Sequence, residues 1–228
     1  MKHFPACFVE LPASTEGRSA RFYLAVEEWV AKNLPEDNYL FTWQLAPTVV
    51  CGRNQDIPAE VNVAFCEETG VEIVRRKSGG GSIYADHNNI MVSLITGAGP
   101  VEPLFEEYAD TVAETLTKLG APCHKSGRND ITLKEGGKIC GNAFYHLPTR
   151  NIVHGTMLYD TDRELMAKIL TPPKEKLERH GVKSVKSRVD TLKEYLPFDV
   201  NELRQQLRLG LTDRSVTITE EQLENLEY

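Results

Sequence analysis

Three cations run directly into three glycines near the middle of the chain, in the segment Arg75-Arg76-Lys77-Ser78-Gly79-Gly80-Gly81. Glycine lets the backbone approach a ligand closely and turn its N–H groups toward it, and arginine adds a forked donor for a carboxylate or phosphate. The segment has neither the Gly-Lys-Ser/Thr ending of a P-loop nor a G-x-G-x-x-G that opens a helix. The pattern therefore favours an anion-binding loop of another kind over a solvated basic turn.

Two further groups of residues have types that suit the same chemistry. Lys138 has glycines on both sides and lies on a predicted strand, where its ammonium could reach a buried anion. His154 and Gly155 enter an apolar strand, where the imidazole could line a site or donate a hydrogen bond. Taken alone, a solvated hairpin lysine and a structural histidine are the more common interpretations, so each group gains weight only from the others.

The length and composition of the chain indicate the class of protein in which these residues lie. The chain has 228 residues, 41% of them hydrophobic and 26% charged, which is typical of a soluble globular protein with a substantial core. A net charge of −7 argues against non-specific nucleic-acid binding, which depends on Lys and Arg meeting phosphates. The first five residues open no long apolar run, so we expect neither a signal peptide nor a membrane span.

The cysteines give no pattern of a disulfide framework or a zinc site. They are five in number, scattered along the chain and never spaced as Cys-x-x-Cys: Cys7, Cys51, Cys66, Cys123 and Cys140. Paired or metal-binding cysteines come in even sets or close spacings. The reducing cytoplasm is therefore the expected location.

Apolar periodicity predicts both helices and strands. The clearest helices have an apolar face at helical spacing, at 21–32 and at 103–119, where Gly120 ends the second. Shorter helices are expected at 62–68, 162–170 and 201–207. Strands are expected at 39–44, 48–51, 72–75, 82–84, 90–95, 130–133, 138–145 and 152–159. The fold class is therefore α+β, with antiparallel hairpins over 130–159 and a tight turn at Gly136-Gly137.

In this order, the three groups resemble the lipoate–protein ligase A family. The resemblance covers about residues 20–198, and each piece is weak alone while the ordered set is specific. The matching pieces are 21–28, 40–44, 48–55, the Arg-Arg-x-Ser-Gly-Gly-Gly loop, Gly127-Arg128-Asn129-Asp130, Lys138, His154-Gly155-Thr156 and 183–189.

The resemblance implies the fold of the biotin/lipoate ligase catalytic domain, which is a central mixed, largely antiparallel β-sheet flanked by helices. It implies a single such domain over 1–228, without the separate C-terminal accessory domain that many ligases carry. It also implies an activity in two steps. ATP and lipoate, with Mg²⁺, give lipoyl-AMP, and a lysine of a lipoyl carrier domain then takes the lipoyl group.

The resemblance also assigns roles to residues of this chain. Lys138 would stabilise charge at the reacting carbonyl and phosphate as the catalytic residue, and Asp130 would help to hold Mg²⁺. The positions matching the ATP and adenylate site are Arg76, Gly81, Ser82, Ile83, Tyr84, Asn89 and Lys138. The positions matching the lipoate site are Arg76, Gly79, Gly80, Lys138, Gly141, Ala143, His154 and Gly155.

The expected partners are lipoyl carrier domains, either acyltransferase subunits of 2-oxoacid dehydrogenases or the glycine-cleavage carrier protein. A separate accessory protein is a further possible partner, and neither nucleic acid nor membrane is expected. The chain departs from the family at 86–89, where Asp-His-Asn-Asn replaces the usual Asp-x-Gly-Asn. Because asparagine tolerates the left-handed conformation, we expect the turn to be kept.

Two alternatives remain open at this level. A lipoyl or octanoyl transferase of the same fold would use a cysteine thiolate as acyl carrier, and Cys123 lies at a suitable distance before Lys138. A catalytic or binding subunit that needs an accessory partner for adenylation is the second. A biotin ligase is disfavoured because its usual loop differs from the one here.

Overall fold

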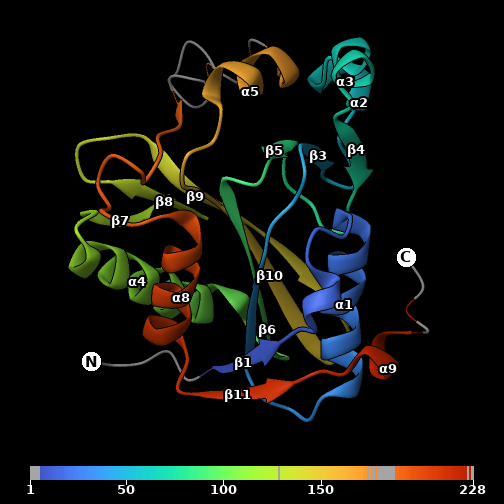
Figure 1. The fold of residues 1–228 in the computed structure, drawn as a ribbon, viewed down its shortest axis with the longest axis vertical. Coiled ribbons are helices and arrows are strands. Elements are labelled where there is room, and N and C mark those ends of the chain that lie inside the picture. Colours follow the sequence, from blue (N-terminus) through green and yellow to red (C-terminus); the bar gives the residue numbers. More distant parts are fainter. Residues whose placement is uncertain are drawn as a thin grey trace.

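The computed structural model describes residues 6–127, 129–173, 175, 178, 188–224 and 226. Arg128 and residues 183–187, which contribute to the family resemblance, lie outside the described residues. The main β-sheet has eight strands in the order β11-β1-β2-β6-β10-β9-β8-β7 (Figure 1). These strands are β1 (Cys7–Glu10), β2 (Tyr39–Trp43), β6 (Asn89–Gly97), β7 (Cys123–Ser126), β8 (Asp130–Leu133), β9 (Lys138–His146), β10 (Arg150–Leu158) and β11 (Arg214–Thr217).

The pairing in this sheet is mixed but largely antiparallel. Strand β1 pairs in parallel with β2 and β11, and the other neighbours pair antiparallel. The hairpins expected over 130–159 are present as β8–β9 and β9–β10. The fold class predicted from the sequence is therefore confirmed.

A second, three-stranded sheet lies next to the main one in the order β4-β3-β5. Its strands are β3 (Thr48–Cys51), β4 (Glu72–Arg75) and β5 (Ile83–Ala85). Three short helices, α2 (Ile57–Glu60), α3 (Val63–Thr69) and α5 (Arg163–Ile169), lie at the same end of the molecule in Figure 1. Buried side chains of α3, α5 and this sheet form a small apolar cluster of their own. The glycine loop, residues 76–82, connects β4 to β5.

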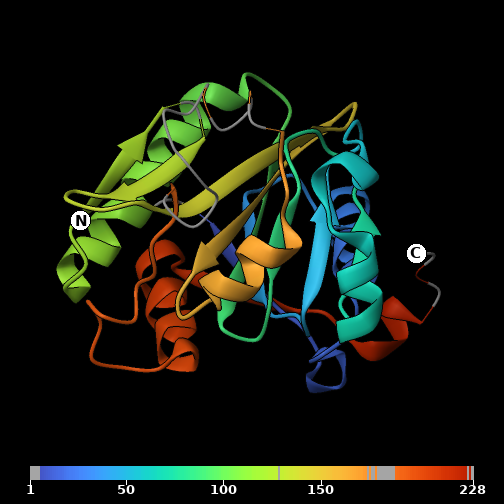
Figure 2. The same cartoon turned by 90° about the horizontal axis from the view of Figure 1, so that it is seen from above.

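The main sheet separates two layers of helices because its central strands alternate their side chains (Figure 2). In β6, Ile90, Val92 and Leu94 pack toward α4 (Val101–Leu119) and α8 (Val200–Leu211). Met91 and Ile95 belong to the opposite cluster, with α1 (Ala20–Asn33). Helices therefore cover each face of the main sheet. A polar side chain on the face that α1 covers is consequently buried between helix and sheet.

The helices expected from periodicity are present with small differences in their ends. The helices predicted at 21–32 and 103–119 are α1 and α4, and Gly120 ends α4 with a φ of 117°. The sequence did not predict β1, β7 and β11, nor the short helices η1 (Ala13–Thr15), α2 and α9 (Glu220–Leu223). These elements have four residues or fewer, and strands β7 and β11 each contain a single hydrophobic residue, so their sequences carry little strand signal.

The turn between β5 and β6 forms differently from the expectation. Asp86 holds it, because its carboxylate accepts from the Asn88 N–H at 2.8 Å and its carbonyl accepts from the Asn89 N–H at 3.1 Å. No described residue other than glycine has a positive φ. The turn is therefore kept, as expected, but the Asp86 carboxylate holds it and neither asparagine adopts the left-handed conformation.

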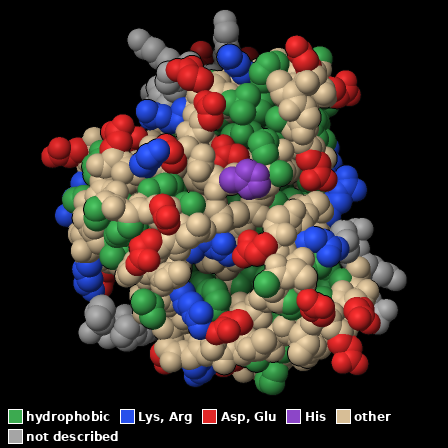
Figure 3. All heavy atoms as spheres, viewed as in Figure 1, with side chains coloured by type: hydrophobic (Ala, Val, Ile, Leu, Met, Phe, Trp, Pro, Cys, Tyr) green, Lys and Arg blue, Asp and Glu red, His purple; other side chains and the backbone are tan. Residues whose placement is uncertain are grey.

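Figure 3 shows acidic and basic side chains interspersed over the face that it presents. Large apolar side chains are seldom exposed in the described part of the chain, Leu209 being the most exposed at 66%. Among the helices that the structure describes, none combines the length and apolar composition needed to span a bilayer.

Candidate active site

A cavity of about 310 Å³ opens where the two sheets meet. One row of cross-strand neighbours forms its floor. Trp43 pairs with Met91, Met91 with Thr156, Thr156 with Gly141, and Gly141 with Asp130, and all five line the cavity. Cross-strand neighbours share a face and successive strands lie about 4.8 Å apart, so this row is roughly 19 Å long.

The two ends of this row differ in chemistry. Trp43 and Met91 are buried, and Leu24 of α1 and Val50 of β3 line the cavity beside them. The opposite end carries Asp130, next to Lys138 and Arg188. The cavity can therefore take a ligand that is apolar at one end and anionic at the other.

Lys138 is held in place from several directions. Its ammonium lies 2.7 Å from Asp130 Oδ1, and Arg188 reaches Asp130 Oδ2 at 3.1 Å. Its main-chain carbonyl accepts from the Asp190 N–H at 2.9 Å. Gly141 makes room for the side chain, because a Cβ at that position would lie 2.3 Å from Lys138 Nζ. Lys138 thus presents a fixed positive charge at the polar end of the cavity.

The surroundings of Asp130 do not fit a resident Mg²⁺ ion. Both of its carboxylate oxygens face cations, whereas Mg²⁺ requires an octahedral set of oxygen ligands that are free to bind it. Among the residues that the structure describes, no group of three His, Cys, Asp or Glu side chains is placed to hold a metal. The assignment of Asp130 to Mg²⁺ therefore remains a prediction, and the geometry favours a role in orienting Lys138.

The side chain of Arg76 points into the glycine loop, where its guanidinium contacts the loop backbone. Its guanidinium donates to the carbonyls of Gly79 and Gly81, each at 2.8 Å, and to that of Val50, also at 2.8 Å. Its Nε–H donates to Ser78 Oγ at 2.9 Å. Burial lowers the pKa of Arg76 to about 10, which leaves it a cation at neutral pH. Arg76 is therefore the clamp that shapes the loop.

The loop also lies very close to the strand next to it. A Cβ on Gly52 would lie 2.0 Å from the carbonyl oxygen of Gly80, and Gly80 itself has a φ of 88°. Only glycine at both positions allows this approach without moving the backbone. The close packing places Gly80, Gly81 and Ser82 at the wall of the cavity.

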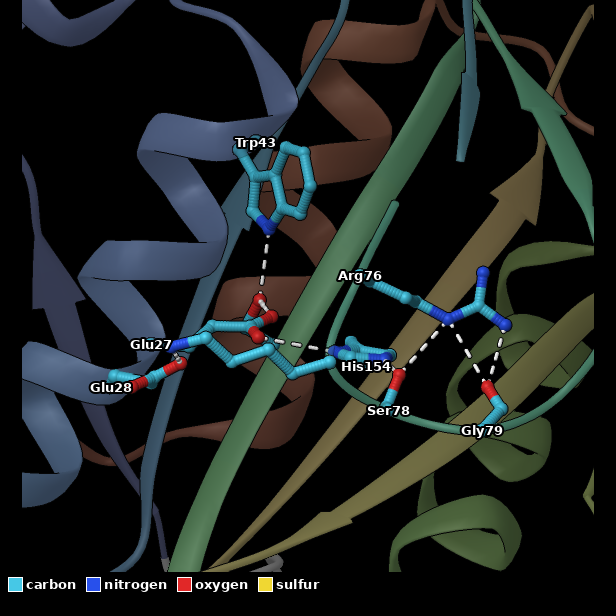
Figure 4. Close-up of polar contacts among 9 residues, drawn as sticks. Glu27, Glu28, Trp43, Arg76, Ser78, Gly79 and His154 are labelled. Carbon is cyan, nitrogen blue, oxygen red and sulfur yellow. Dashed lines mark hydrogen bonds and ion pairs between the residues drawn. The ribbon is translucent and has the colours of Figure 1, made fainter. Parts of the chain in front are cut away.

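His154 connects the Arg76 clamp to a buried carboxylate on α1 (Figure 4). Its Nε2 lies 2.6 Å from Ser78 Oγ, and its Nδ1 lies 3.1 Å from Glu27 Oε2. Ser93 donates to the other Glu27 oxygen at 2.5 Å and accepts from Trp43 Nε1 at 2.8 Å. Glu27 is 2% exposed, so this network lies between helix and sheet, where its members also line a second cavity of about 610 Å³ on the α1 side.

Most residues nominated by the resemblance meet at the cavity. Those that line it are Arg76, Gly80, Gly81, Ser82, Ile83, Tyr84, Asp130, Lys138, Gly141, Ala143 and His154. Gly79 and Gly155 are neighbours of lining residues and do not line it themselves. Asn89 is fully buried, where it donates to the Tyr84 carbonyl and accepts from Thr161. Asn89 therefore joins β5 and β6, and the structure does not place it at the cavity.

Cys123 lies in the core between the main sheet and α4, away from the cavity. The residue is 5% exposed, and its thiol donates to the Ala121 carbonyl at 3.1 Å. Burial raises the pKa of Cys123 to about 11, and the thiolate is the form that attacks an acyl group. The structure thus argues against Cys123 as an acyl carrier.

Sequence reasoning did not identify the apolar wall or Glu27. Trp43, Met91 and Leu24 are apolar residues of ordinary strands and helices, and their meeting depends on sheet pairing. Glu27 did give a signal, because a carboxylate four residues after Tyr23 and three before Val30 falls on the apolar face of the predicted helix. A charged residue on a buried face requires partners, and here they are Ser93 and His154.

Comparison with known protein families gives one matching model, described as the lipoyl protein ligase A/B catalytic domain, over residues 19–212. Among curated proteins, the chain is 38% identical over 178 residues to lipoate-protein ligase LplJ of Bacillus subtilis (strain 168). It is 41% identical over 181 residues to a probable lipoate-protein ligase A of Mycoplasma pneumoniae. Each match covers 77% of this chain, which spans about half the length of these relatives, 54% and 53%.

Solved structures show the same fold at lower sequence identity. A bi-partite lipoate protein ligase from Thermoplasma acidophilum, described together with its E2 lipoyl domain, superposes with a TM-score of 0.82. The match has 24% identity and covers 98% of this chain and 91% of that one. A lipoate-protein ligase A bound with ATP has a TM-score of 0.79 at 20% identity and covers 98% of this chain and 92% of that one.

Proposed function

The chain belongs to the lipoyl protein ligase A/B catalytic domain family, and from that premise we propose that it is a lipoate–protein ligase. It joins lipoate to AMP with ATP and then transfers the lipoyl group to a lysine of a carrier domain. The main support for this proposal is the row of residues from Trp43 to Asp130. This row is apolar at the Trp43 end and polar at the Asp130 end, where Lys138 holds a fixed positive charge.

The apolar end suits the acyl part of lipoate. A dithiolane on a five-carbon acid is apolar until its carboxylate, so it needs an apolar wall with a polar mouth. Trp43, Met91, Leu24 and Val50 supply the wall. We assign the lipoate side of the cavity to these residues and to Arg76, Gly80, Lys138, Gly141, Ala143 and His154, with Gly79 and Gly155 behind them.

The polar end suits the nucleotide and the reacting carboxylate. We assign ATP and the adenylate to the loop and strand formed by Gly81, Ser82, Ile83 and Tyr84, all of which line the cavity. Arg76 supports this wall from behind, because its guanidinium donates to the Gly81 carbonyl. Lys138 is the catalytic residue in this proposal, since its ammonium lies at this end beside Arg188 and is positioned by Asp130 and by the space at Gly141.

In the first step, a lipoate carboxylate oxygen attacks the α-phosphorus of ATP and pyrophosphate leaves. Negative charge builds up on the phosphoryl oxygens, and Lys138 is preorganised to meet it. Mg²⁺ would neutralise the polyphosphate of ATP, and it would be held by phosphate oxygens and water because Asp130 is already paired.

In the second step, the neutral amine of a carrier lysine attacks the carbonyl carbon of lipoyl-AMP and AMP leaves. We propose a lipoyl domain as the carrier, by analogy with the E2 lipoyl domain described with the Thermoplasma ligase. Acyltransferase subunits of 2-oxoacid dehydrogenases and the glycine-cleavage carrier protein are the two candidates. All five cysteines are free, which is consistent with a reaction in the cytoplasm.

The length of the relatives bears on the first step. Because the chain spans about half of their length, we propose that a further domain or a separate accessory protein assists adenylation. The Thermoplasma ligase, which this chain resembles in fold, is described as bi-partite. Transfer from preformed lipoyl-AMP requires only the cavity described here and should not depend on such a partner.

The proposal is tested by mass spectrometry of a purified lipoyl carrier domain. We expect a lipoyl adduct from lipoyl-AMP, and from lipoate with ATP and Mg²⁺ when any accessory component is present. Lys138→Ala should slow transfer by about 10²- to 10³-fold, the usual effect of removing one preorganised donor. Lys125→Ala is the matched control, since Lys125 makes an ion pair of the same length, 2.7 Å, with Glu106 away from the cavity. Transfer by folded Lys138→Ala at the wild-type rate would contradict the assignment, and transfer from an acylated carrier without ATP would contradict the ligase class.

A further inference from the structure

We propose that Glu27 is a positioning residue, which acts through His154 and Ser78 on the Arg76 clamp and so fixes the glycine loop at the wall of the cavity. This inference rests on the proposed function for its effect on lipoyl transfer. Glu27 lies on α1, His154 on β10, and Ser78 and Arg76 on the loop, and hydrogen bonds link them in this order (Figure 4).

The donors and acceptors in this chain of hydrogen bonds are matched when His154 is neutral. The Arg76 Nε–H donates to Ser78 Oγ and to the Gly79 carbonyl, and the Ser78 hydroxyl proton then donates to His154 Nε2. His154 then carries its proton on Nδ1, from which it donates to Glu27 Oε2. Each of these hydrogen bonds then has one donor and one acceptor, so the orientation of each side chain restricts the orientation of the next.

The chain also joins two buried charges of opposite sign. Arg76 is 6% exposed and Glu27 is 2% exposed, and the negative charge of Glu27 counteracts the effect of burial on the pKa of Arg76. Removing a charged hydrogen-bonding partner from a buried site leaves the remaining groups unpaired, which is costly. Glu27 therefore stabilises the inward orientation of Arg76 even though the two side chains do not touch.

Members of this hydrogen-bonded chain lie between two cavities of the protein. Arg76 and His154, with Leu24, line both the cavity of the candidate active site and a second cavity of about 610 Å³ on the α1 side. Lys77 and Glu28 also join the loop to α1 at the surface, so loss of the buried chain would free the inner side of the loop, at Arg76 and Ser78, to shift toward this second space. The catalytic cavity is bounded by the loop itself, so its shape depends on the connection.

The order Glu–His–Ser is also the order of a nucleophilic triad, but the geometry here differs. Ser78 is 2% exposed, and its oxygen already accepts from Arg76. A nucleophile needs an oxygen that a carbonyl carbon can approach. The hydroxyl of Ser78 therefore serves as a link between His154 and Arg76.

The experiment uses two variants and their combination. Ser78→Ala removes the link and keeps the Glu27–His154 contact, and Glu27→Met removes the carboxylate at similar side-chain volume. We expect each to lower kcat for transfer from lipoyl-AMP by about 10- to 100-fold, because misplacement by about 1 Å has effects of this size. KM for the carrier should stay unchanged, since Glu27, Ser78 and His154 are all buried and present little surface to a carrier domain. The double variant should be no slower than the slower single variant, because both break one connection.

Lys32→Gln is the control on the same helix. Lys32 is exposed and pairs with Glu28 at 3.2 Å, so this change removes a charge of α1 without touching the buried chain or the glycine loop. It should leave kcat near the wild-type value. If Glu27→Met does not fold, Ser78→Ala alone decides, since it alters one hydroxyl only.

A spectroscopic measurement decides the question independently of activity. In ¹⁵N NMR spectra of the wild type, we expect His154 as the Nδ1–H tautomer and a slowly exchanging Arg76 Nε–H signal. Ser78→Ala should keep the tautomer and speed the exchange of that Nε–H. Multiplicative losses of kcat, an unchanged Arg76 exchange rate in Ser78→Ala, or an acyl adduct on Ser78 would each overturn the proposal. Absence of any lipoyl transfer by the wild type would instead count against the proposed function.

Discussion

The substitution Gly141→Ala should displace the Lys138 side chain while leaving the stability of the fold nearly unchanged. Gly141 lies on β9 and faces the cavity, and its φ is one that alanine adopts. A Cβ there would lie 2.3 Å from Lys138 Nζ and 2.5 Å from its Cε. Ordinary contact begins at about 3.4 Å, so the ammonium has to move by about 1 Å or more. The lysine side chain can move in this way because only its far end is affected.

The expected effects on catalysis and on stability therefore differ in size. A displacement of about 1 Å at a catalytic group can cost about 100-fold, which corresponds to about 2.7 kcal/mol in the activation free energy. The free energy of unfolding should change by less than about 1 kcal/mol, since alanine at a compatible glycine position slightly stabilises the chain and the clash is relieved by a flexible side chain. Lys138 would also leave the hydrogen bond with Asp130 that now orients it.

The assay is the initial rate of carrier lipoylation from lipoyl-AMP, together with the thermal unfolding midpoint of the same samples. Gly97→Ala is a matched control because Gly97 also lies on a strand, and its nearest neighbour would be a flexible carboxylate, Glu36 Oε1 at 3.0 Å, remote from the cavity. Gly97→Ala should leave the rate unchanged. An unchanged rate in Gly141→Ala would refute the placement of Lys138, and a large fall in its unfolding midpoint would refute the steric argument.

Two further substitutions test the neighbours of the site. Cys123→Ser should keep most of the transfer activity, because a buried thiol with a pKa raised to about 11 holds little thiolate at neutral pH; complete loss, with a thioester trapped on the wild type, would move the protein to the thiol transferases. Asp130→Asn should lower kcat about tenfold, the equivalent of about one charge-assisted hydrogen bond lost between Asp130 and Lys138, and should not change the Mg²⁺ concentration needed for half-maximal rate. A marked rise in that concentration would identify Asp130 as a metal ligand after all.

The sequence predicted those elements whose pattern repeats within a short stretch. Helices α1 and α4 have an apolar period of several turns, and the hairpins over 130–158 have clear turns between them. Strands β1 and β11 were not predicted because their pairing joins residues 7–10 to residues 214–217. Local patterns carry no information on such distant partners.

The same distinction applies to the candidate site. The glycine loop and Lys138 were identified because unusual residue types stand side by side in the sequence. The row from Trp43 through Met91 and Thr156 has no such signature, since its members are ordinary strand residues until the sheet aligns them. The sequence predicted Asp130 at the site as a Mg²⁺ ligand, and its pairing with Lys138 and Arg188 could not be predicted because the fold brings the two cations to it.

Residues 188–190, which are distant from Lys138 in the sequence, connect Lys138 to helix α5 at the cavity. Residues 188–190 hold it twice, through the Val189 bridge to its backbone and through Arg188 on its partner Asp130. Arg163 of α5 in turn donates to the Val189 carbonyl at 3.2 Å and contacts Asp190 at 3.4 Å. Since Met166 of the same helix lines the cavity, a ligand that packs against α5 acts on the helix that restrains this segment. The position of the Lys138 ammonium thus depends on contacts across three stretches of chain, which would let a lysine in a glycine-rich hairpin stabilise developing charge in the role proposed for it.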